Sequence, residues 1–303
     1  MSLDPQIAAL LAGLDAGFPP VHTMSGPEAR AAIRSRFVPN PHPEPVAEVN
    51  DVDVGPLRVR HYRPAAATPL PILVFAHGGG FVFCDLDTHD GLCRALANLI
   101  PAVVISVDYR LAPEHPWPTA AEDVYALTQW AAEHADHLGG DARRIVVGGD
   151  SAGGNLAAVT ALMARDRGSP AIAGHLLLYP VLAADFTTES YRLFGEGFYN
   201  PAIAMRWYWD QYLPAPADRA HPHASPLMAE LTGLPPAVIV VAGHDPLRDE
   251  GLAYCDGLTS AGVPHVLARF DGAIHGFMTM PTLELAQAAR QRVARELGTL
   301  LSR

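Results

Sequence analysis

The segment Gly149-Asp150-Ser151-Ala152-Gly153-Gly154 most constrains the fold, because it lies between two different periodic patterns. The run 144–148 before it, apolar after its first residue, predicts a buried strand, and a helical pattern begins at Asn155. A Gly-x-Ser-x-Gly sequence in this context predicts a tight strand-to-helix turn that presents the serine hydroxyl at the edge of a sheet. We therefore predict that Ser151 is a nucleophile and that the Ala152 amide faces the same site.

A second glycine-rich segment, His77-Gly78-Gly79-Gly80, follows the apolar run 70–75, which predicts another buried strand. Backbone amides without side chains allow a substrate to come close, so we predict that Gly78 and Gly79 join the amide after the serine in an oxyanion hole. The alternative interpretation is that this segment is only a flexible loop. A phosphate cradle is disfavoured because no Gly-Lys-Ser/Thr follows and the chain contains no lysine. We expect His77 to anchor this loop through hydrogen bonds.

A nucleophilic serine needs a histidine that takes its proton and a carboxylate that orients the histidine. On a parallel sheet such groups follow the strands at their carboxyl ends. In hydrolases whose serine lies in a Gly-x-Ser-x-Gly turn of this kind, the chain order is serine, acid, histidine. The apolar run 236–242 predicts a strand, and Asp245 lies in the loop after it. The run 265–270 predicts the next strand, and His275 follows that one. We predict that Asp245 and His275 complete the catalytic set.

Other residues compete for these roles. Asp271 and Asp249 are alternative acids, although Asp271 shares the loop of the histidine and fits a turn better. His244 adjoins the acid in the same loop, so it is poorly placed to bridge acid and serine. The pair in His221-Pro222-His223 has a proline between its members and no nearby cysteine or carboxylate ligand, so no metal site is predicted there.

Six segments together resemble the hormone-sensitive-lipase-like esterases, bacterial family IV of the α/β-hydrolase superfamily, in the family's order and spacing over residues 45–300. They are His77-Gly78-Gly79-Gly80, Asp108-Tyr109-Arg110-Leu111-Ala112-Pro113-Glu114, Gly149-Asp150-Ser151-Ala152-Gly153-Gly154, Tyr179-Pro180, Asp245-Pro246-Leu247-Arg248-Asp249-Glu250 and His275-Gly276-Phe277. The resemblance implies a serine carboxylesterase that hydrolyses short- to medium-chain acyl esters without a cofactor. An amidase or formamidase with the same catalytic residues is the alternative. A non-catalytic receptor of this fold is disfavoured, because such receptors lack the histidine that is present here.

The remaining patterns predict the rest of the fold. Runs 46–54 and 57–63 read as an antiparallel hairpin, after which strands and helices alternate as far as a helix near 283–300. We expect an α/β-hydrolase fold with a mostly parallel eight-stranded sheet flanked by helices, in one domain over residues 1–303. Residues 1–45 and the insertion 185–225 do not fit the alternation.

In the resembling family these two segments form a helical cap over the serine. The insertion contains several aromatic residues, and we expect some of them to line the acyl pocket. The candidates are Phe198, Tyr199 and Trp207.

The composition limits the kinds of binding partner and the cellular location that we expect. A hydrophobic fraction of 49% suits a parallel sheet covered on both faces, and a net charge of −11 argues against nucleic acid and anionic membranes. Cys84, Cys93 and Cys255 are an odd number without ligand spacing, as expected for reduced thiols. With no basic leader and no apolar run of membrane-spanning length, the expected location is cytoplasmic. The expected partner is a small-molecule ester, and the sequence leaves a homodimer open.

Overall fold

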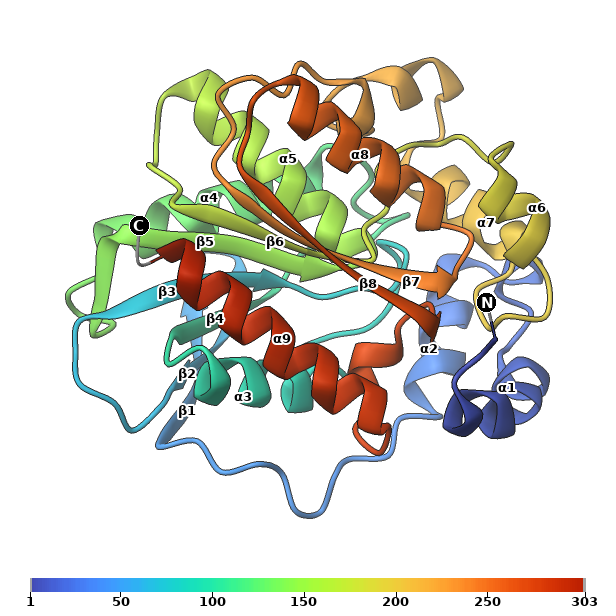
Figure 1. The fold of residues 1–303 in the computed structure, drawn as a ribbon, viewed down its shortest axis with the longest axis horizontal. Helices are drawn as coiled ribbons and strands as arrows, with labels where there is room; N and C mark the ends of the chain where they lie inside the picture. The colour runs from blue at the N-terminus through green and yellow to red at the C-terminus, as the bar shows by residue number, and fades with distance from the viewer. Residues whose placement is uncertain (1, 302–303) are drawn as a thin grey trace.

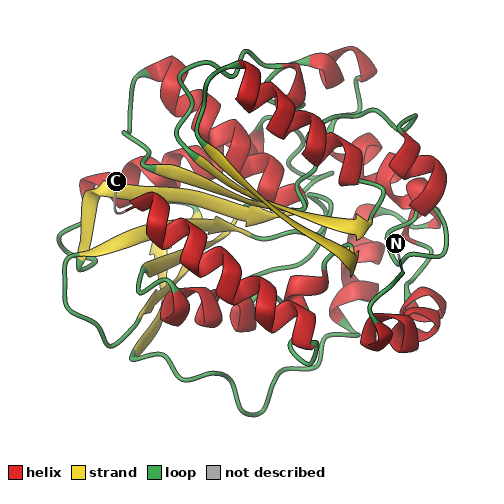
Figure 2. Ribbon diagram, viewed as in Figure 1, coloured by secondary structure: helices red, strands yellow, loops and turns green. Residues whose placement is uncertain are grey.

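The computed structural model describes residues 2–301, and a twisted sheet runs through their centre (Figure 1, Figure 2). Its strands are β1 (Glu48–Val54), β2 (Leu57–Arg63), β3 (Leu70–Ala76), β4 (Val103–Asp108), β5 (Gly140–Asp150), β6 (Gly174–Leu178), β7 (Ala237–His244) and β8 (His265–Ile274). Within the described residues their order is β1-β2-β4-β3-β5-β6-β7-β8, and β2 alone runs in the direction opposite to the other strands. The predicted mostly parallel, eight-stranded sheet is confirmed.

Helices cover both faces of this sheet, and others gather beyond its carboxyl edge (Figure 1). One face carries α3 (Asp90–Leu99) and α9 (Glu284–Leu301), and the other carries α4 (Thr119–Glu133), α5 (Ala152–Arg167) and α8 (Arg248–Ser260). Beyond the carboxyl ends of the strands lie α1 (Pro5–Gly17), α2 (Gly26–Arg34), α6 (Glu189–Phe194) and α7 (Ala202–Tyr212). Because helices cover both faces of the sheet, the side chains on both faces of the strands are buried. The sequences of these strands are therefore continuous apolar runs.

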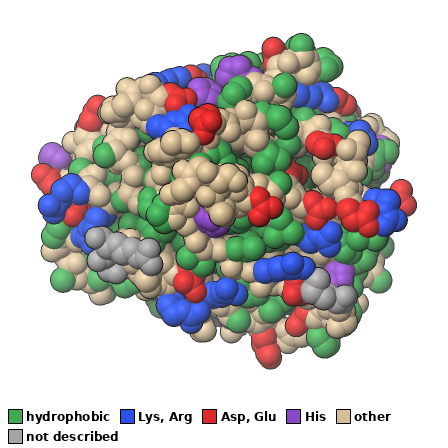
Figure 3. Space-filling model, turned by 45° about the horizontal axis from the view of Figure 1, so that its top comes forward, with side chains coloured by type: hydrophobic (Ala, Val, Ile, Leu, Met, Phe, Trp, Pro, Cys, Tyr) green, Lys and Arg blue, Asp and Glu red, His purple; other side chains and the backbone are tan. Residues whose placement is uncertain are grey.

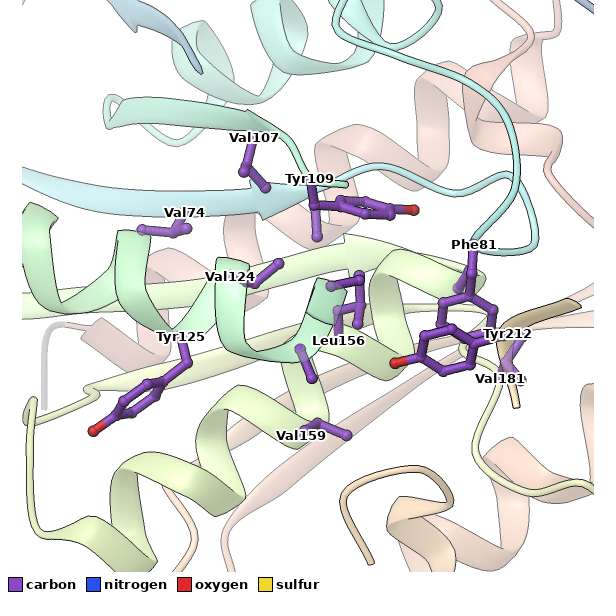
Figure 4. Close-up of a cluster of buried hydrophobic side chains, with 14 of the residues drawn as sticks. Val74, Phe81, Val107, Tyr109, Val124, Tyr125, Leu156, Val159, Val181 and Tyr212 are labelled. Carbon is purple, nitrogen blue, oxygen red and sulfur yellow. The ribbon is translucent and has the colours of Figure 1, made fainter. Parts of the chain in front are cut away.

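Successive side chains of each strand point to opposite faces of the sheet, so the hydrophobic core forms two layers, one on each face. On β3, Leu73 and Phe75 face the layer of α3 and α9, whereas Val74 faces the layer of α4 and α5. Figure 4 shows part of that second layer, where Val74 lies near Val124 of α4 and Leu156 of α5, all fully buried. Each such side chain contributes about 1.5–3 kcal/mol through burial, so the sheet provides a rigid platform for the loops at its edge.

The N-terminal segment and the insertion meet at the carboxyl edge of the sheet. The rings of Phe18 and Tyr199 pack edge to face with centroids 5.6 Å apart, and the Tyr199 amide donates to Asp15 Oδ1 at 2.6 Å. Segments that lie about 180 residues apart in the sequence are therefore joined by direct contacts.

On the face drawn in Figure 3, arginine and carboxylate side chains are interspersed. Across residues 2–301, no helix has both the length and the apolar character needed to cross a bilayer.

Candidate active site

The serine turn is built at the junction of β5 and α5. Ser151 has φ 55° and ψ −118°, a strained conformation for a residue with a side chain. A Cβ on Gly149 would lie 2.3 Å from the carbonyl oxygen of Gly153, and a Cβ on Gly153 would lie 1.9 Å from that of Ala76. Glycine is therefore required on both sides, and the turn lifts the serine hydroxyl above the sheet edge.

The three predicted catalytic side chains come together at this edge. His275 Nε2 lies 2.9 Å from Ser151 Oγ, and His275 Nδ1 lies 2.7 Å from Asp245 Oδ2. Asp245 is fully buried, and its Oδ1 accepts the Leu247 amide at 2.9 Å. With Nδ1–H donated to the carboxylate, Nε2 is left as the acceptor for the serine proton.

The rival residues lie elsewhere. The Asp271 side chain is 46% exposed and pairs with Arg269. Asp249 Oδ2 accepts the Ser190 amide at 2.7 Å, which fastens the insertion to α8. The His244 ring packs against two phenylalanine rings of the insertion, with centroids 5.1 and 5.6 Å away. None of these three contacts reaches Ser151, so the geometry favours the acid and the histidine that were predicted.

The glycine loop requires a correction to the predicted oxyanion donors. The Gly78 amide already donates to Asp150 Oδ1 at 2.9 Å, so it does not point at a substrate. The amides of Gly79, Gly80 and Ala152, in contrast, meet no acceptor among the described residues. Gly79 and Gly80 line the pocket beside the serine. The donor set that fits is therefore the second and third glycines of the loop with Ala152.

Contacts on both sides hold the glycine loop. His77 Nδ1 lies 2.7 Å from the Gly78 carbonyl oxygen, and the His77 ring stacks on Tyr109 at 4.3 Å. Burial lowers the pKa of His77 to about 4, so the ring is neutral at pH 7. After the glycines, Phe81 stacks on Tyr212 of α7 with centroids 3.8 Å apart (Figure 4). His77 thus contacts the loop as expected.

A cavity of about 120 Å³ lies over the serine, and aromatic rings bound it. Its lining includes Phe18, Phe83, Tyr199, Asn200, Tyr208 and Thr279. A second cavity of about 550 Å³ adjoins it and shares Cys84, His89 and Thr279 with it. The site therefore offers a small chamber beside the nucleophile and a larger one next to it.

Of the three candidate pocket residues, the structure brings one to the serine. Tyr199 lines the small cavity. Phe198 instead stacks on the His244 ring, and Trp207 packs into the core with 8% of its surface exposed. The neighbouring Tyr208 takes the place expected for Trp207, because successive helical residues point about 100° apart. The sequence shows that the insertion is rich in aromatic residues. It does not show which side of α7 faces the serine.

The hydrogen-bonded chain of Asp245, His275 and Ser151 includes neither a cysteine nor the histidine pair. Burial raises the pKa of the Cys84 thiol to about 12, so it stays protonated near the serine. His223 faces Asp166 at 3.6 Å. In the part of the chain that the structure describes, no three histidine, cysteine or carboxylate side chains gather as metal ligands.

Comparison with known proteins places this geometry in a family. A model of the alpha/beta hydrolase fold matches residues 73–279. A carboxylic ester hydrolase, LipN, of Mycobacterium tuberculosis is 46% identical over 274 residues, covering 86% of this chain and 72% of its own. The chain is a hormone-sensitive-lipase-like member of the α/β-hydrolase superfamily. The family assignment also makes it a carboxylic-ester hydrolase, since its relatives are esterases.

Two further relatives of this hormone-sensitive-lipase-like enzyme match almost its whole length. An ethyl acetate hydrolase of Pseudomonas putida is 37% identical over 300 residues, covering 93% of this chain and 94% of its own. The solved structure of a hyperthermophilic esterase from Pyrobaculum calidifontis superposes with a TM-score of 0.92 at 41% identity and covers 99% of both chains. The fold is thus shared over almost the whole chain.

Proposed function

We propose that this protein is a serine carboxylesterase that cleaves short- to medium-chain acyl esters through Ser151, His275 and Asp245. One observation carries the proposal. An uninterrupted hydrogen-bonded chain runs from the buried Asp245 through His275 to Ser151 Oγ. Gly79 and Gly80, whose amides meet no acceptor among the described residues, line the same cavity as Ser151, where a carbonyl would develop negative charge.

Acylation follows from the positions of these groups. His275 Nε2 takes the serine proton while Ser151 Oγ bonds to the ester carbonyl carbon, and the carbonyl electron pair moves to its oxygen. The amides of Gly79, Gly80 and Ala152 donate to that oxyanion. When the tetrahedral intermediate collapses, the bond to the alcohol oxygen breaks and His275 returns the proton to the departing alcohol.

Deacylation repeats the sequence with water. His275 removes a proton from water as the water oxygen attacks the acyl carbon, and the same amides hold the second oxyanion. Collapse breaks the bond to Ser151 Oγ, and His275 reprotonates the serine. Asp245 remains ionised throughout and fixes the orientation of the imidazole.

The shape of the site supports a short or medium acyl group. We assign α1, α2, α6 and α7 to a cap, formed by residues 1–45 and 185–225, that closes the small cavity with aromatic rings. A pocket of finite depth gains about 0.8 kcal/mol for each methylene it buries, until the chain no longer fits. p-Nitrophenyl esters of about four to eight acyl carbons should therefore be cleaved fastest, and palmitate should be cleaved poorly.

Covalent labelling tests the proposed chemistry. A p-nitrophenyl alkylphosphonate should release one equivalent of p-nitrophenol and leave one phosphonyl group on Ser151, identified by peptide mass spectrometry. Ser151→Ala should take up no label while keeping the parent circular-dichroism spectrum. A label on another residue, or an unlabelled parent that still hydrolyses p-nitrophenyl butyrate, would contradict the proposal.

A further inference from the structure

The residue before the nucleophile is a buried acid that the mechanism above does not use. Asp150 ends β5 and is 4% exposed, and its Oδ1 accepts the Gly78 amide at 2.9 Å. We propose that Asp150, held by His89, is a positioning residue that aims the amides of Gly79 and Gly80 at the oxyanion. This inference rests on the proposed function and adds a component to it.

Packing between the acid and the glycine loop is close. A Cβ on Gly78 would lie 2.5 Å from Asp150 Oδ2, so the first glycine of the loop is needed to let the carboxylate approach. The contact joins two segments that are 72 residues apart in sequence. Because Asp150 directly precedes Ser151, the turn that places the nucleophile also places the loop that would receive the oxyanion.

His89, immediately before α3, holds the other side of the carboxylate. Its Nε2 lies 3.1 Å from Asp150 Oδ1 and 3.3 Å from Oδ2, and the ring is 5% exposed. Thr88 Oγ1 lies 3.0 Å from His89 Nδ1 and donates its own proton to the Asp85 carbonyl oxygen at 2.8 Å. The ring is therefore held between Thr88 and the Asp150 carboxylate, with Nε2 beside the acid.

The surroundings favour the ionised acid. Burial opposes ionisation of Asp150, but the neighbouring His89 ring and the Gly78 amide outweigh it and hold its pKa below the ordinary value. A hydrogen bond to an ionised acceptor is roughly twice as strong as a neutral one. The Gly78 amide is therefore firmly oriented in a loop whose glycines would otherwise move freely.

Catalysis is sensitive to this orientation. Oxyanion donors act when they lie about 2.7–3.1 Å from the developing charge, and the loss of one donor costs about 10²–10³ in kcat. Without the contact to Asp150, the serine and the histidine stay in place, but the amides of Gly79 and Gly80 are no longer oriented toward the oxyanion. The defect should appear in the transition state, with little effect on substrate binding.

The test compares Asp150→Ala with Asp150→Asn. The alanine variant should lower kcat for p-nitrophenyl butyrate by about 10²-fold with KM within about threefold, by analogy with a lost oxyanion donor. The asparagine variant keeps an Oδ1 acceptor for the Gly78 amide and should recover most of that loss. A short-chain trifluoromethyl ketone forms a serine adduct with an oxyanion, so its inhibition constant should weaken by the same factor as kcat/KM.

Asp123→Ala is the matched control. Asp123 is another buried acid, bonded to Arg110 at 2.6 Å on α4. Its loss should lower the unfolding temperature and leave kcat unchanged. If Asp150→Ala behaves in the same way, with kcat within threefold of the parent, the positioning role is wrong. A drop in kcat without weaker ketone binding contradicts it equally.

A second pair keeps the test decisive if Asp150→Ala does not fold. His89→Gln retains an N–H for the carboxylate, whereas His89→Ala does not, so the alanine variant should be the slower by about tenfold in kcat. Equal kcat values in the two variants would overturn the proposal. Labelling of the parent by the phosphonate separates the two hypotheses, because a parent without label on Ser151 refutes the proposed function itself.

Discussion

At the residue scale, the site depends on backbone positions as much as on side chains. Ser151 occupies a strained turn that glycines permit, and Gly80 adopts φ +59° beneath an aromatic ring of α7. Packing around Ser151 holds its strained conformation, which is how strain persists at functional sites.

Gly80→Ala tests one of the proposed oxyanion donors. A Cβ at this position would lie 2.5 Å from the Tyr208 ring and would require a positive φ, so the loop must shift and the amide must move. We expect kcat to fall about 10²–10³-fold, as for a lost oxyanion donor. The control Gly298→Ala adds a methyl to α9 with no atom within 4 Å and should leave kcat unchanged. A Gly80→Ala enzyme with parent kcat would remove this amide from the mechanism.

At the element scale, Glu250 fixes the segment after β6 against α8. It is a buried carboxyl whose Oε2 accepts the amides of Leu182 and Ala183 at 2.5 and 2.7 Å. Burial raises the pKa of Glu250 well above its ordinary value, so the environment disfavours the charged form. A neutral amide should therefore replace it without penalty.

Urea unfolding of two variants checks this role. Glu250→Gln keeps an acceptor for both amides, and its free energy of unfolding should stay within about 1 kcal/mol of the parent. Glu250→Ala leaves two buried amides unsatisfied and should lose about 2–5 kcal/mol. Equal losses in both variants would show that the hydrogen bonds to the Leu182 and Ala183 amides do not account for the stabilisation.

The elements differ in how far the sequence reveals them. Buried strands such as β3 and β7 were predicted closely, because continuous apolar runs identify them. The start of β5 was missed since Asp141 and Arg143 interrupt its apolar pattern at the surface. Helix α8 was not predicted, although Asp249 and Glu250 in its first turn are a helix-start signal.

Within the site, local motifs predicted the residues that now meet around Ser151, but not every partner of the glycine loop. The Gly78 amide is occupied because Asp150 approaches it across 72 residues, and no local pattern carries that information. Tyr208 was missed for a different reason: the orientation of α7 depends on packing against Gly80 and Phe83. Non-local contacts thus decide the details that motifs leave open.

At the scale of the whole molecule, buried neutral histidines make stability depend on pH. Burial lowers the pKa of His77 and of His175 to about 4. The unfolded chain, with histidine near 6.5, binds more protons between these two values, so stability falls as the pH drops through that window. Each histidine should remove about 2 kcal/mol by pH 5 relative to pH 7.

His175→Asn isolates this effect away from the site. The variant should lose less free energy of unfolding between pH 7 and pH 5 than the parent, by about 2 kcal/mol, whatever its stability at pH 7. His42→Asn, at an exposed position, should keep the parent slope. An unchanged slope in His175→Asn would mean that this ring is protonated in the folded state.

The central claim is that Ser151 and His275 act as one catalytic unit, and a double-mutant kinetic cycle tests it most directly. Ser151→Ala and His275→Ala should each lower kcat for p-nitrophenyl butyrate by about 10⁶-fold, as in other serine hydrolases, and the double variant should be no slower than either. Asp245→Asn should cost about 10⁴-fold through loss of the productive tautomer. A Ser151→Ala enzyme within tenfold of the parent, or losses that multiply in the double variant, would contradict the account.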